Sequence, residues 1–570
     1  MSESLTSRGQ VLTKGRENLS ELVDNWSSGI TRSRGISRVT DLLLQPAVLL
    51  LILVGFVVSR GITRGEFFFY GDEMSHAMNG VFFRDFLVDL PLRHPIQYVY
   101  SYYAKYPALA FPHWPPLFHF LEGIFFLLFG LSPFVSRLTI LCFSLMGVYF
   151  WYRIAERLGP RYRAFLSAVI LACLPFVLLY ERITMLEIPI LAACLAVIHF
   201  WLKFRETERP SHLWILAGWT AAAFLISQKA IFLAFFIVFD VIIERRFRLL
   251  RRVDTWLAAI ACVLAILPWY LVAAHTLSFM VGRAIPKRAH YLAITENYTF
   301  YLTRLYGQLG PVLIGLACVG LLLAVIRRSR SDRFLLLWVL AGYVCFVLIV
   351  EKDPRHTMLW IPPLIYLALL GLETLCVRQL FGVMACSVLA LIFVVNGLRA
   401  PRPRVTGAEE TAKFVYSLPE SDVVYFQGEL DGDFIFFARK LDAQKRRLVA
   451  REKQIVVTDV GRKPSTVLAT TDEVLHFFKS WGIRYAAIDN VDDLPGLGAV
   501  RTLLNSDQFE LIRTIPIESN VPRFHNREIQ VFRFRGELQR TDQNVVIPMM
   551  TIHKDISVNL SSVTGHPWPN

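Results

Sequence analysis

Seven ionisable side chains stand at the edges of apolar segments, spread over nearly 300 positions of the chain. They are Asp72, Glu73, Glu187, Lys229, Lys352, Arg355 and His356. Ionisable groups at a membrane boundary are costly to place and often serve a substrate path. A carboxylate there can take a proton from an attacking hydroxyl, and cationic groups can stabilise a phosphate whose negative charge grows as it leaves. If one fold brings them to the same side of the membrane, the seven residues predict chemistry on a charged lipid.

Each of these residues also has a purely structural explanation. Asp72 and Glu73 can be a solvated pair that starts a helix. Glu187 is followed by Pro189 at the start of an apolar segment, and both residue types favour a helix N-terminus. Lys229 can extend its ammonium to water along its aliphatic stem. The argument for function therefore depends on whether the residues meet.

The segment 276–308 carries further cations, Arg283 and Arg288, that suit a phosphate. His76 and His113 are candidate ligands of a divalent metal, together with His290, although their spacing matches no known metal motif. The sequence indicates no certain cofactor beyond that possible metal.

The composition is that of an integral membrane protein. Hydrophobic residues make up 54% of the chain, and the mean hydropathy is +0.44. The net charge of +14 comes largely from arginines in short loops between apolar runs. Such charges set the orientation of a membrane protein, so we expect the lipid bilayer and no nucleic acid as a partner.

The charges flanking the apolar runs predict one topology. Arginines precede the first run, Leu42–Val58, so residues 1–41 are expected to form a cytoplasmic arm. Residues 61–116 then form a large extracytoplasmic loop. The apolar run 117–129 is too short for a bilayer that needs roughly 20 residues, and we expect it to lie along the interface. The further spans are 134–152, 163–181, 188–203, 212–227, 230–243, 254–274, 309–326, 334–350, 357–375 and 380–398. With Leu42–Val58 this makes about eleven membrane spans.

This threading places arginine-rich loops inside and all seven ionisable residues outside. It also places residues 399–570 outside as a soluble α/β domain, which contains no cysteine. There the pattern predicts strands at Val423–Phe426, Phe434–Phe437 and Tyr485–Ile488. It predicts a helix at Glu473–Trp481 that is capped by Asp472 and ended by Gly482.

In order along the chain, several short motifs between residues 42 and 398 resemble those of the GT-C glycosyltransferases, in the branch of protein O-mannosyltransferases and aminoarabinose transferases. They are Asp72-Glu73, Pro115-Pro116-Leu117 before Phe129-Gly130, Arg137, Leu186-Glu187, Gln228-Lys229, Leu267-Pro268-Trp269 and Lys352-Asp353-Pro354-Arg355-His356. Each is weak alone, and their shared order is fairly specific. The aminoarabinose transferases carry an acidic-basic pair where this chain has His113 and Trp114.

The resemblance implies a polytopic helical membrane protein that takes a sugar from a polyprenyl-phosphate carrier on the outer face. By this resemblance Asp72 is the catalytic base, with Glu73 and Glu187 beside it. Lys229 and Lys352 hold the carrier phosphate, with Arg355 and His356 nearby.

The expected function is an inverting transfer of a hexose or pentose to a hydroxyl acceptor on protein, lipid or glycan. The alternatives are a flippase for a lipid-linked sugar, a non-catalytic scaffold that binds through the C-terminal domain, and an oligosaccharide-transferring GT-C enzyme. A bacterial inner membrane is favoured, with the N-terminus cytoplasmic and the C-terminal domain periplasmic.

Overall fold

The computed structural model describes residues 45–63, 65–67, 71–276, 294–457, 465–489, 497–540, 544–549 and 554–564. The expected N-terminal arm, Arg283, Arg288 and His290 lie outside these residues. The chain divides into two compact units, residues 1–53 and 54–570. Of the first unit, residues 45–53 are described, and they contain the beginning of helix α3 (Pro46–Ser59).

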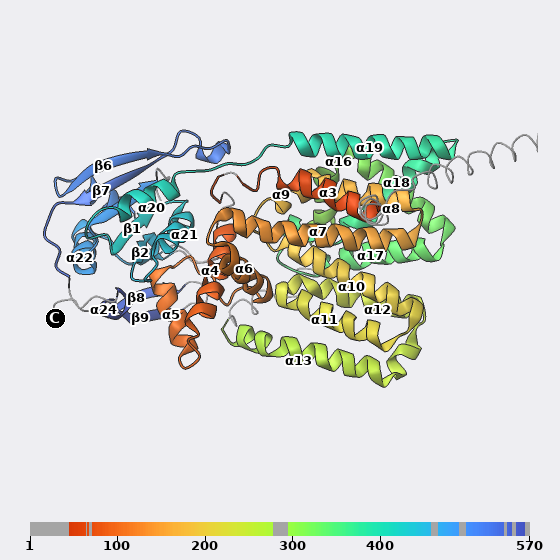
Figure 1. The fold of residues 1–570 in the computed structure, drawn as a ribbon, viewed down its shortest axis with the longest axis horizontal. Coiled ribbons are helices and arrows are strands. Elements are labelled where there is room, and N and C mark those ends of the chain that lie inside the picture. The colour runs from red at the N-terminus through yellow and green to blue at the C-terminus, as the bar shows by residue number, and fades with distance from the viewer. Residues whose placement is uncertain are drawn as a thin grey trace, which may run out of the picture. The chain divides into compact units, whose positions relative to one another are not determined.

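The second unit contains a bundle of apolar helices, drawn from orange to green in Figure 1. They are α7 (Pro133–Leu158), α8 (Arg161–Cys173), α9 (Pro175–Glu181), α10 (Glu187–Thr207), α11 (Pro210–Ile226), α12 (Ile231–Ile243), α13 (Val253–Thr276), α16 (Glu296–Arg327), α17 (Arg330–Val347), α18 (Ile361–Leu375) and α19 (Gln379–Arg399). Short 3-10 turns, η1 (Gln228–Ala230), η2 (Phe247–Arg251) and η3 (Pro354–Leu359), join several of them. The helix bounds fall within a few residues of most of the predicted spans.

Within the described residues, five helices are long and apolar enough to cross a membrane, and α8 with α9 makes a sixth if this pair, bent by 66°, is one span. Pro175 begins α9 and explains the bend, because proline cannot donate to the preceding turn. The helices α3, α6 (Leu117–Phe129), α11 and α18 are apolar but shorter. The chain is a polytopic helical membrane protein, and the count of about eleven spans stays a prediction.

Three helices follow α3 in the chain before α7 begins: α4 (Asp72–Asp89), α5 (Pro95–Lys105) and α6. Helices α4 and α6 pack closely because each has a glycine at the contact, where a side chain would clash with the other helix. A Cβ atom on Gly80 would lie 2.4 Å from a carboxylate oxygen of Glu122, and one on Gly123 would lie 2.8 Å from the backbone nitrogen of Arg84. This contact fixes α4, which begins with Asp72, against the apolar helix that the sequence predicted to be interfacial.

The C-terminal domain is built on a five-stranded mixed sheet of order β2-β1-β5-β7-β6. Its strands are β1 (Val423–Gln427), β2 (Leu448–Arg451), β5 (Tyr485–Asp489), β6 (Phe509–Pro516) and β7 (Glu528–Phe534). The small pairs β3 (Val456–Val457) with β4 (Ser465–Thr466) and β8 (Asn544–Met549) with β9 (Lys554–Asn559) lie outside this sheet. The helical elements are α20 (Ala408–Tyr416), α21 (Asp431–Leu441), α22 (Thr471–Trp481), α23 (Gly498–Leu504), α24 (Leu560–Thr564), η4 (Glu452–Gln454) and η5 (Pro522–Phe524). The predicted strands Val423–Phe426 and Tyr485–Ile488 are confirmed.

Two local predictions for this domain were wrong. Phe434–Phe437 is part of helix α21, not a strand, and all four side chains are buried because the helix packs against both the sheet and α4. A helix that is buried all round reads as a continuous apolar run, which periodicity cannot distinguish from a strand. Helix α22 ends at Gly482 as predicted, but its cap is Thr470, whose hydroxyl accepts from the Glu473 backbone N–H at 3.2 Å.

Buried polar contacts attach the C-terminal domain to the segment around α4. The Asp85 carboxylate accepts two hydrogen bonds from Arg439, at 2.7 and 2.8 Å, and a third from the Tyr102 hydroxyl at 2.7 Å. Before α4, the Glu66 carboxylate accepts from the backbone N–H groups of residues 407, 408 and 409 at the start of α20. Burial raises the pKa of Glu66 to about 7 although these amides act to lower it.

Candidate active site

Asp72 is the first residue of α4 and one of the more accessible acids of the predicted set. The preceding Gly71 has φ 78°, a left-handed conformation that favours glycine, and it turns the chain into the helix. The Asp72 side chain is 41% exposed. A carboxylate held by the first turn of a helix and open on one side is placed to accept a proton from an incoming group.

Arg355 joins Asp72 to the other predicted residues. Its Nη1 atom lies 3.3 Å from Asp72 Oδ2, and its Nε atom lies 3.5 Å from Glu187 Oε1. A closer contact is made to Asp353, with Nε to Oδ2 at 2.6 Å. Asp353 also accepts from the Arg355 backbone N–H and so caps the turn η3 that carries Arg355. The guanidinium is therefore held by its own turn and directed at two acids from distant segments.

Glu187 and Lys229 complete the cluster. Lys229 Nζ donates to Glu187 Oε1 at 2.8 Å, so one oxygen of Glu187 faces both Lys229 and Arg355. The other oxygen, Oε2, is buried and has no hydrogen-bond partner among the described residues. Glu187 begins α10, and Lys229 lies in the turn η1 between α11 and α12. Both cations keep partial exposure, 21% for Lys229 and 25% for Arg355, and each has further N–H groups to offer an anion.

Glu73 lies next to Asp72 in the chain but faces another part of the structure. It is fully buried, its Oε1 accepts from the Thr184 backbone N–H at 3.1 Å, and the Arg137 Nε atom lies 3.7 Å away. Arg137 also donates to the Glu66 carbonyl. Glu73 thus ties the start of α4 to α7 and to the loop that leads into Glu187.

Lys352 and His356 flank the cluster through separate contacts. Lys352 Nζ donates to the carbonyls of Phe346 and Val347 at the end of α17, at 2.9 and 2.8 Å, and lies 5.3 Å from the Tyr301 ring centroid. Burial lowers its pKa to about 8. His356 is hydrogen-bonded through Nδ1 to the Tyr301 hydroxyl at 2.9 Å and stacks on Phe346. Burial lowers the pKa of His356 to about 3, with the nearby Lys229 as a further cause.

The predicted histidines gather around Trp114. His76 Nδ1 is 3.0 Å from His119 Nε2, and the His76 and His113 ring centroids lie 4.1 and 4.6 Å from that of Trp114. Burial lowers the pKa of His76 well below its usual range, with smaller contributions from His119, His113, Arg355 and Lys229. No group of three His, Cys, Asp or Glu side chains in the described part of the chain is arranged to hold a metal. The metal site predicted from His76 and His113 is therefore not formed among the described residues, and its third candidate, His290, lies outside them.

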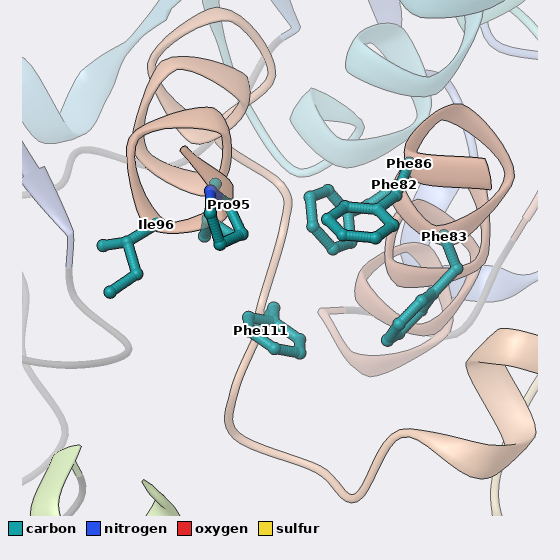
Figure 2. A pocket seen from close by; sticks show the side chains of 7 residues that line it. Phe82, Phe83, Phe86, Pro95, Ile96 and Phe111 are labelled. Carbon is teal, nitrogen blue, oxygen red and sulfur yellow. The ribbon is translucent and has the colours of Figure 1, made fainter. Parts of the chain in front are cut away.

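An apolar cavity of about 250 Å³ lies between α4 and α5, where the C-terminal half of α4 lines it (Figure 2). Its wall carries no charged group and consists of Phe82, Phe83, Phe86, Pro95, Ile96, Val99 and Phe111. Phe111 also packs edge-on against Trp269 of α13, with ring centroids 5.5 Å apart. The cavity supplies no group for acid–base chemistry and is separate from the ion-pair cluster.

Residues 113–271 match the family model for dolichyl-phosphate-mannose-protein mannosyltransferases. The crystal structure of ArnT from Cupriavidus metallidurans in the apo state superposes with a TM-score of 0.58 at 16% identity, over 85% of this chain and 97% of that one. The chain has a GT-C glycosyltransferase fold. The resemblance predicted from the ordered motifs is therefore confirmed.

Further solved structures share the GT-C fold. ArnT from the same organism bound to undecaprenyl phosphate matches with a TM-score of 0.54 at 15% identity, with 85% of this chain and 97% of that chain covered. The Archaeoglobus fulgidus oligosaccharyltransferase in its apo form matches with a TM-score of 0.50 at 12% identity, over 78% and 69% of the two chains. No curated protein sequence matches this chain.

Sequence reasoning missed three residues that support the site of this GT-C protein. Arg137 was noted only as a motif residue, although a fully buried arginine in an apolar segment is a signal of a fixed polar contact. His119 is a polar residue in the apolar run 117–129, but its partner His76 could not be identified without the fold. Tyr301, which orients His356, carries no signal in the sequence.

Proposed function

We propose that this chain is an inverting glycosyltransferase, which transfers a sugar from a polyprenyl-phosphate carrier to a hydroxyl acceptor on the outer face of the membrane. The N-terminus is cytoplasmic and the C-terminal domain periplasmic, in a bacterial inner membrane. The observation that carries the proposal is the continuous cluster in which Arg355 joins the accessible carboxylate of Asp72 to Glu187 and Lys229. The undecaprenyl phosphate bound by the similar ArnT supports the carrier class.

Asp72 acts as the base. It takes the proton of the acceptor hydroxyl while the hydroxyl oxygen forms a bond to the anomeric carbon. The attack comes from the face opposite the phosphate, so the bond between the anomeric carbon and the phosphate oxygen breaks with inversion. The electron pair of that bond leaves with the polyprenyl phosphate.

Lys229 and Arg355 stabilise the leaving group. A phosphodiester with one negative charge becomes a phosphomonoester as the bond breaks, and cations placed beforehand stabilise the growing charge. Glu187 holds both cations by one oxygen and leaves Oε2 to accept from the sugar. Glu73 is a positioning residue, because its contacts hold the backbone of α4 next to Asp72.

The test is sugar transfer in proteoliposomes that contain purified protein, radiolabelled polyprenyl-phosphate monosaccharides and a crude envelope acceptor. Asp72→Asn should lower transfer roughly 10²–10⁴-fold, the usual range for loss of a general base. Asp89→Asn is the matched control, since Asp89 lies at the other end of the same helix and binds Tyr98. A folded Asp72→Asn protein with full activity on a demonstrated lipid-sugar donor would refute the base. Label that reaches the opposite leaflet without transfer would instead establish the flippase.

A further inference from the structure

His76 sits one helical turn after Asp72 on α4, so the two residues share a face of the helix. Side chains in a helix lean toward its N-terminus, and His76 therefore covers the turn that Asp72 begins. The imidazole is 2% exposed, and its electrostatic neighbours include Arg355 and Lys229. The ring thus lies next to the turn that carries the proposed base, and the two cations of the proposed phosphate site are near it.

The hydrogen bond that this ring makes leaves one of its nitrogens outside the contact. His76 Nδ1 and His119 Nε2 are 3.0 Å apart, so one of them must donate and the other accept. Whichever of the two donates, this bond occupies Nδ1 of His76 and leaves Nε2 outside it.

Packing keeps Nε2 of His76 in place. Trp114 lies against the His76 ring, with the centroids 4.1 Å apart and the planes inclined by 42°. Phe118 meets the same ring edge-on at 6.5 Å. A flip of the imidazole would break the bond to His119, and the neighbouring rings leave it one orientation. Nδ1 is the only atom of His76 with a hydrogen-bond partner in the described parts of the chain.

We infer that His76 Nε2 is a hydrogen-bond partner for a hydroxyl of the donor sugar, and that it helps to determine which sugar the site takes. The inference rests on the proposed function. The sugar is covalently attached to the phosphate, so a phosphate held by Lys229 and Arg355 brings the sugar next to the first turn of α4, which carries Asp72 and is covered by His76. A neutral imidazole nitrogen suits a neutral sugar hydroxyl, which can donate or accept a hydrogen bond.

Two variants separate the two nitrogens of His76. His76→Asn places an amide group near the position of Nδ1 and removes the hydrogen-bonding group at Nε2. His76→Gln reaches the position of Nε2 with an amide group and gives up the bond to His119. We expect His76→Asn to raise the donor KM about 10-fold, in the range for one lost hydrogen bond, with the acceptor KM unchanged. His76→Gln should keep a donor KM closer to that of the wild type.

A panel of mono-deoxy donors gives the decisive comparison. With the wild type, one deoxy donor should show a KM raised about 10-fold, and in His76→Asn that difference should vanish because the partner of the missing hydroxyl is already gone. Donor binding measured by thermal stabilisation of the full-length protein in detergent should weaken in parallel. This readout depends on binding and not on turnover.

Each other outcome overturns the inference. An unchanged KM in a folded His76→Asn protein that transfers sugar excludes the contact while leaving the proposed function intact. A KM change confined to the acceptor excludes the donor sugar as the partner. A deoxy-donor difference that persists in His76→Asn shows that another residue binds that hydroxyl. If the wild type transfers no sugar and no donor stabilises it, the proposed function fails and this inference with it.

Discussion

Lys229 and Glu187 allow a structural ion pair to be distinguished from a phosphate site by a double-mutant cycle. The perturbations are Lys229→Met, Glu187→Gln and the two together. The Lys229 ammonium donates to Glu187 at 2.8 Å, and the two side chains are 21% and 3% exposed. Removing either charge alone leaves the other without its closest partner, whereas removing both leaves no new unpaired charge.

The magnitudes follow from the distance and the burial. At 2.8 Å and an effective dielectric constant of 20, the Coulomb attraction is about 6 kcal/mol before the cost of desolvation. Desolvation opposes most of this, and coupling energies within such networks are about 0.5–3 kcal/mol. A charge-assisted hydrogen bond from Lys229 to the carrier phosphate is worth about 1.5–3 kcal/mol, or roughly 10–150-fold in the donor KM.

The assay measures two quantities for each protein, the apparent midpoint of thermal unfolding in detergent and the donor KM. We expect both single variants to unfold at lower temperature and the double variant to regain part of the loss. The donor KM of the double variant should stay raised, because methionine cannot bind phosphate. Lys440→Met with Glu409→Gln is a matched control, since this pair at 2.9 Å lies in the C-terminal domain. A donor KM that recovers together with stability would refute the phosphate role of Lys229.

Three further predictions concern the contacts that hold the site. The pKa of Glu66 is raised from 4.5 to about 7, so between these pH values Glu66 binds more protons in the folded than in the unfolded protein. It therefore contributes stability at low pH, and this stability is lost as the pH rises through 7. Glu66→Gln should therefore flatten the wild-type decline in the unfolding midpoint between pH 5 and 8, a contribution of up to about 3 kcal/mol; equal slopes would contradict this. Arg439→Met removes two charge-assisted hydrogen bonds from the buried Asp85, which keeps Arg84 and Tyr102 as partners. It should cost about 1.5–3 kcal/mol, seen as faster proteolysis of the C-terminal domain, with the more exposed Arg513→Met as control. Gly123→Ala should cost about 1–3 kcal/mol in detergent unfolding, because its Cβ would meet backbone at 2.8 Å, whereas Gly218→Ala meets nothing within 4 Å and should be neutral or stabilising.

The sequence predicted the helices well because their signal is local. The predicted span 380–398 matches α19 within one residue at each end, 188–203 matches α10 within four, and the short run 117–129 coincides with α6. The charges flanking those runs also predicted that all seven ionisable residues lie on the same side of the membrane, which left open which of them meet. The structure brings Asp72, Glu187, Lys229 and Arg355 together, and their roles in catalysis stay predictions.

Which partner each side chain of the site contacts could not be predicted, because this depends on the directions in which neighbouring side chains point. Asp72 and Glu73 are adjacent in the chain, yet successive helical residues face directions about 100° apart. One therefore faces Arg355 and the other Arg137. The pairing of His76 with His119, 43 residues apart, likewise requires the close approach of α4 and α6 through Gly80 and Gly123.

The charges of the cluster indicate a use for Lys352. Three carboxylates, Asp72, Glu187 and Asp353, face the two cations Lys229 and Arg355, which leaves one negative charge before any donor binds. A bound phosphodiester adds one more negative charge, and the phosphomonoester product carries yet another. Transfer at this site therefore calls for another cation. Lys352 lies three residues before Arg355 in the chain, and its charge adds to burial in lowering the pKa of His356.

Its lowered pKa makes this role testable. Because burial lowers the pKa of Lys352 to about 8, the ammonium is present at pH 7 and is lost as the pH rises through 8 in the free protein. The donor kcat/KM should therefore fall between pH 7 and 9, up to 10-fold per unit above the pKa. Lys352→Arg should extend the active range upward, since a guanidinium keeps its charge at pH 9, and Lys352→Met should be weak and nearly independent of pH over this interval. A wild-type profile that stays flat to pH 9, or that declines equally in Lys352→Arg, would assign the decline elsewhere and leave Lys352 as a cap for the carbonyls that end α17.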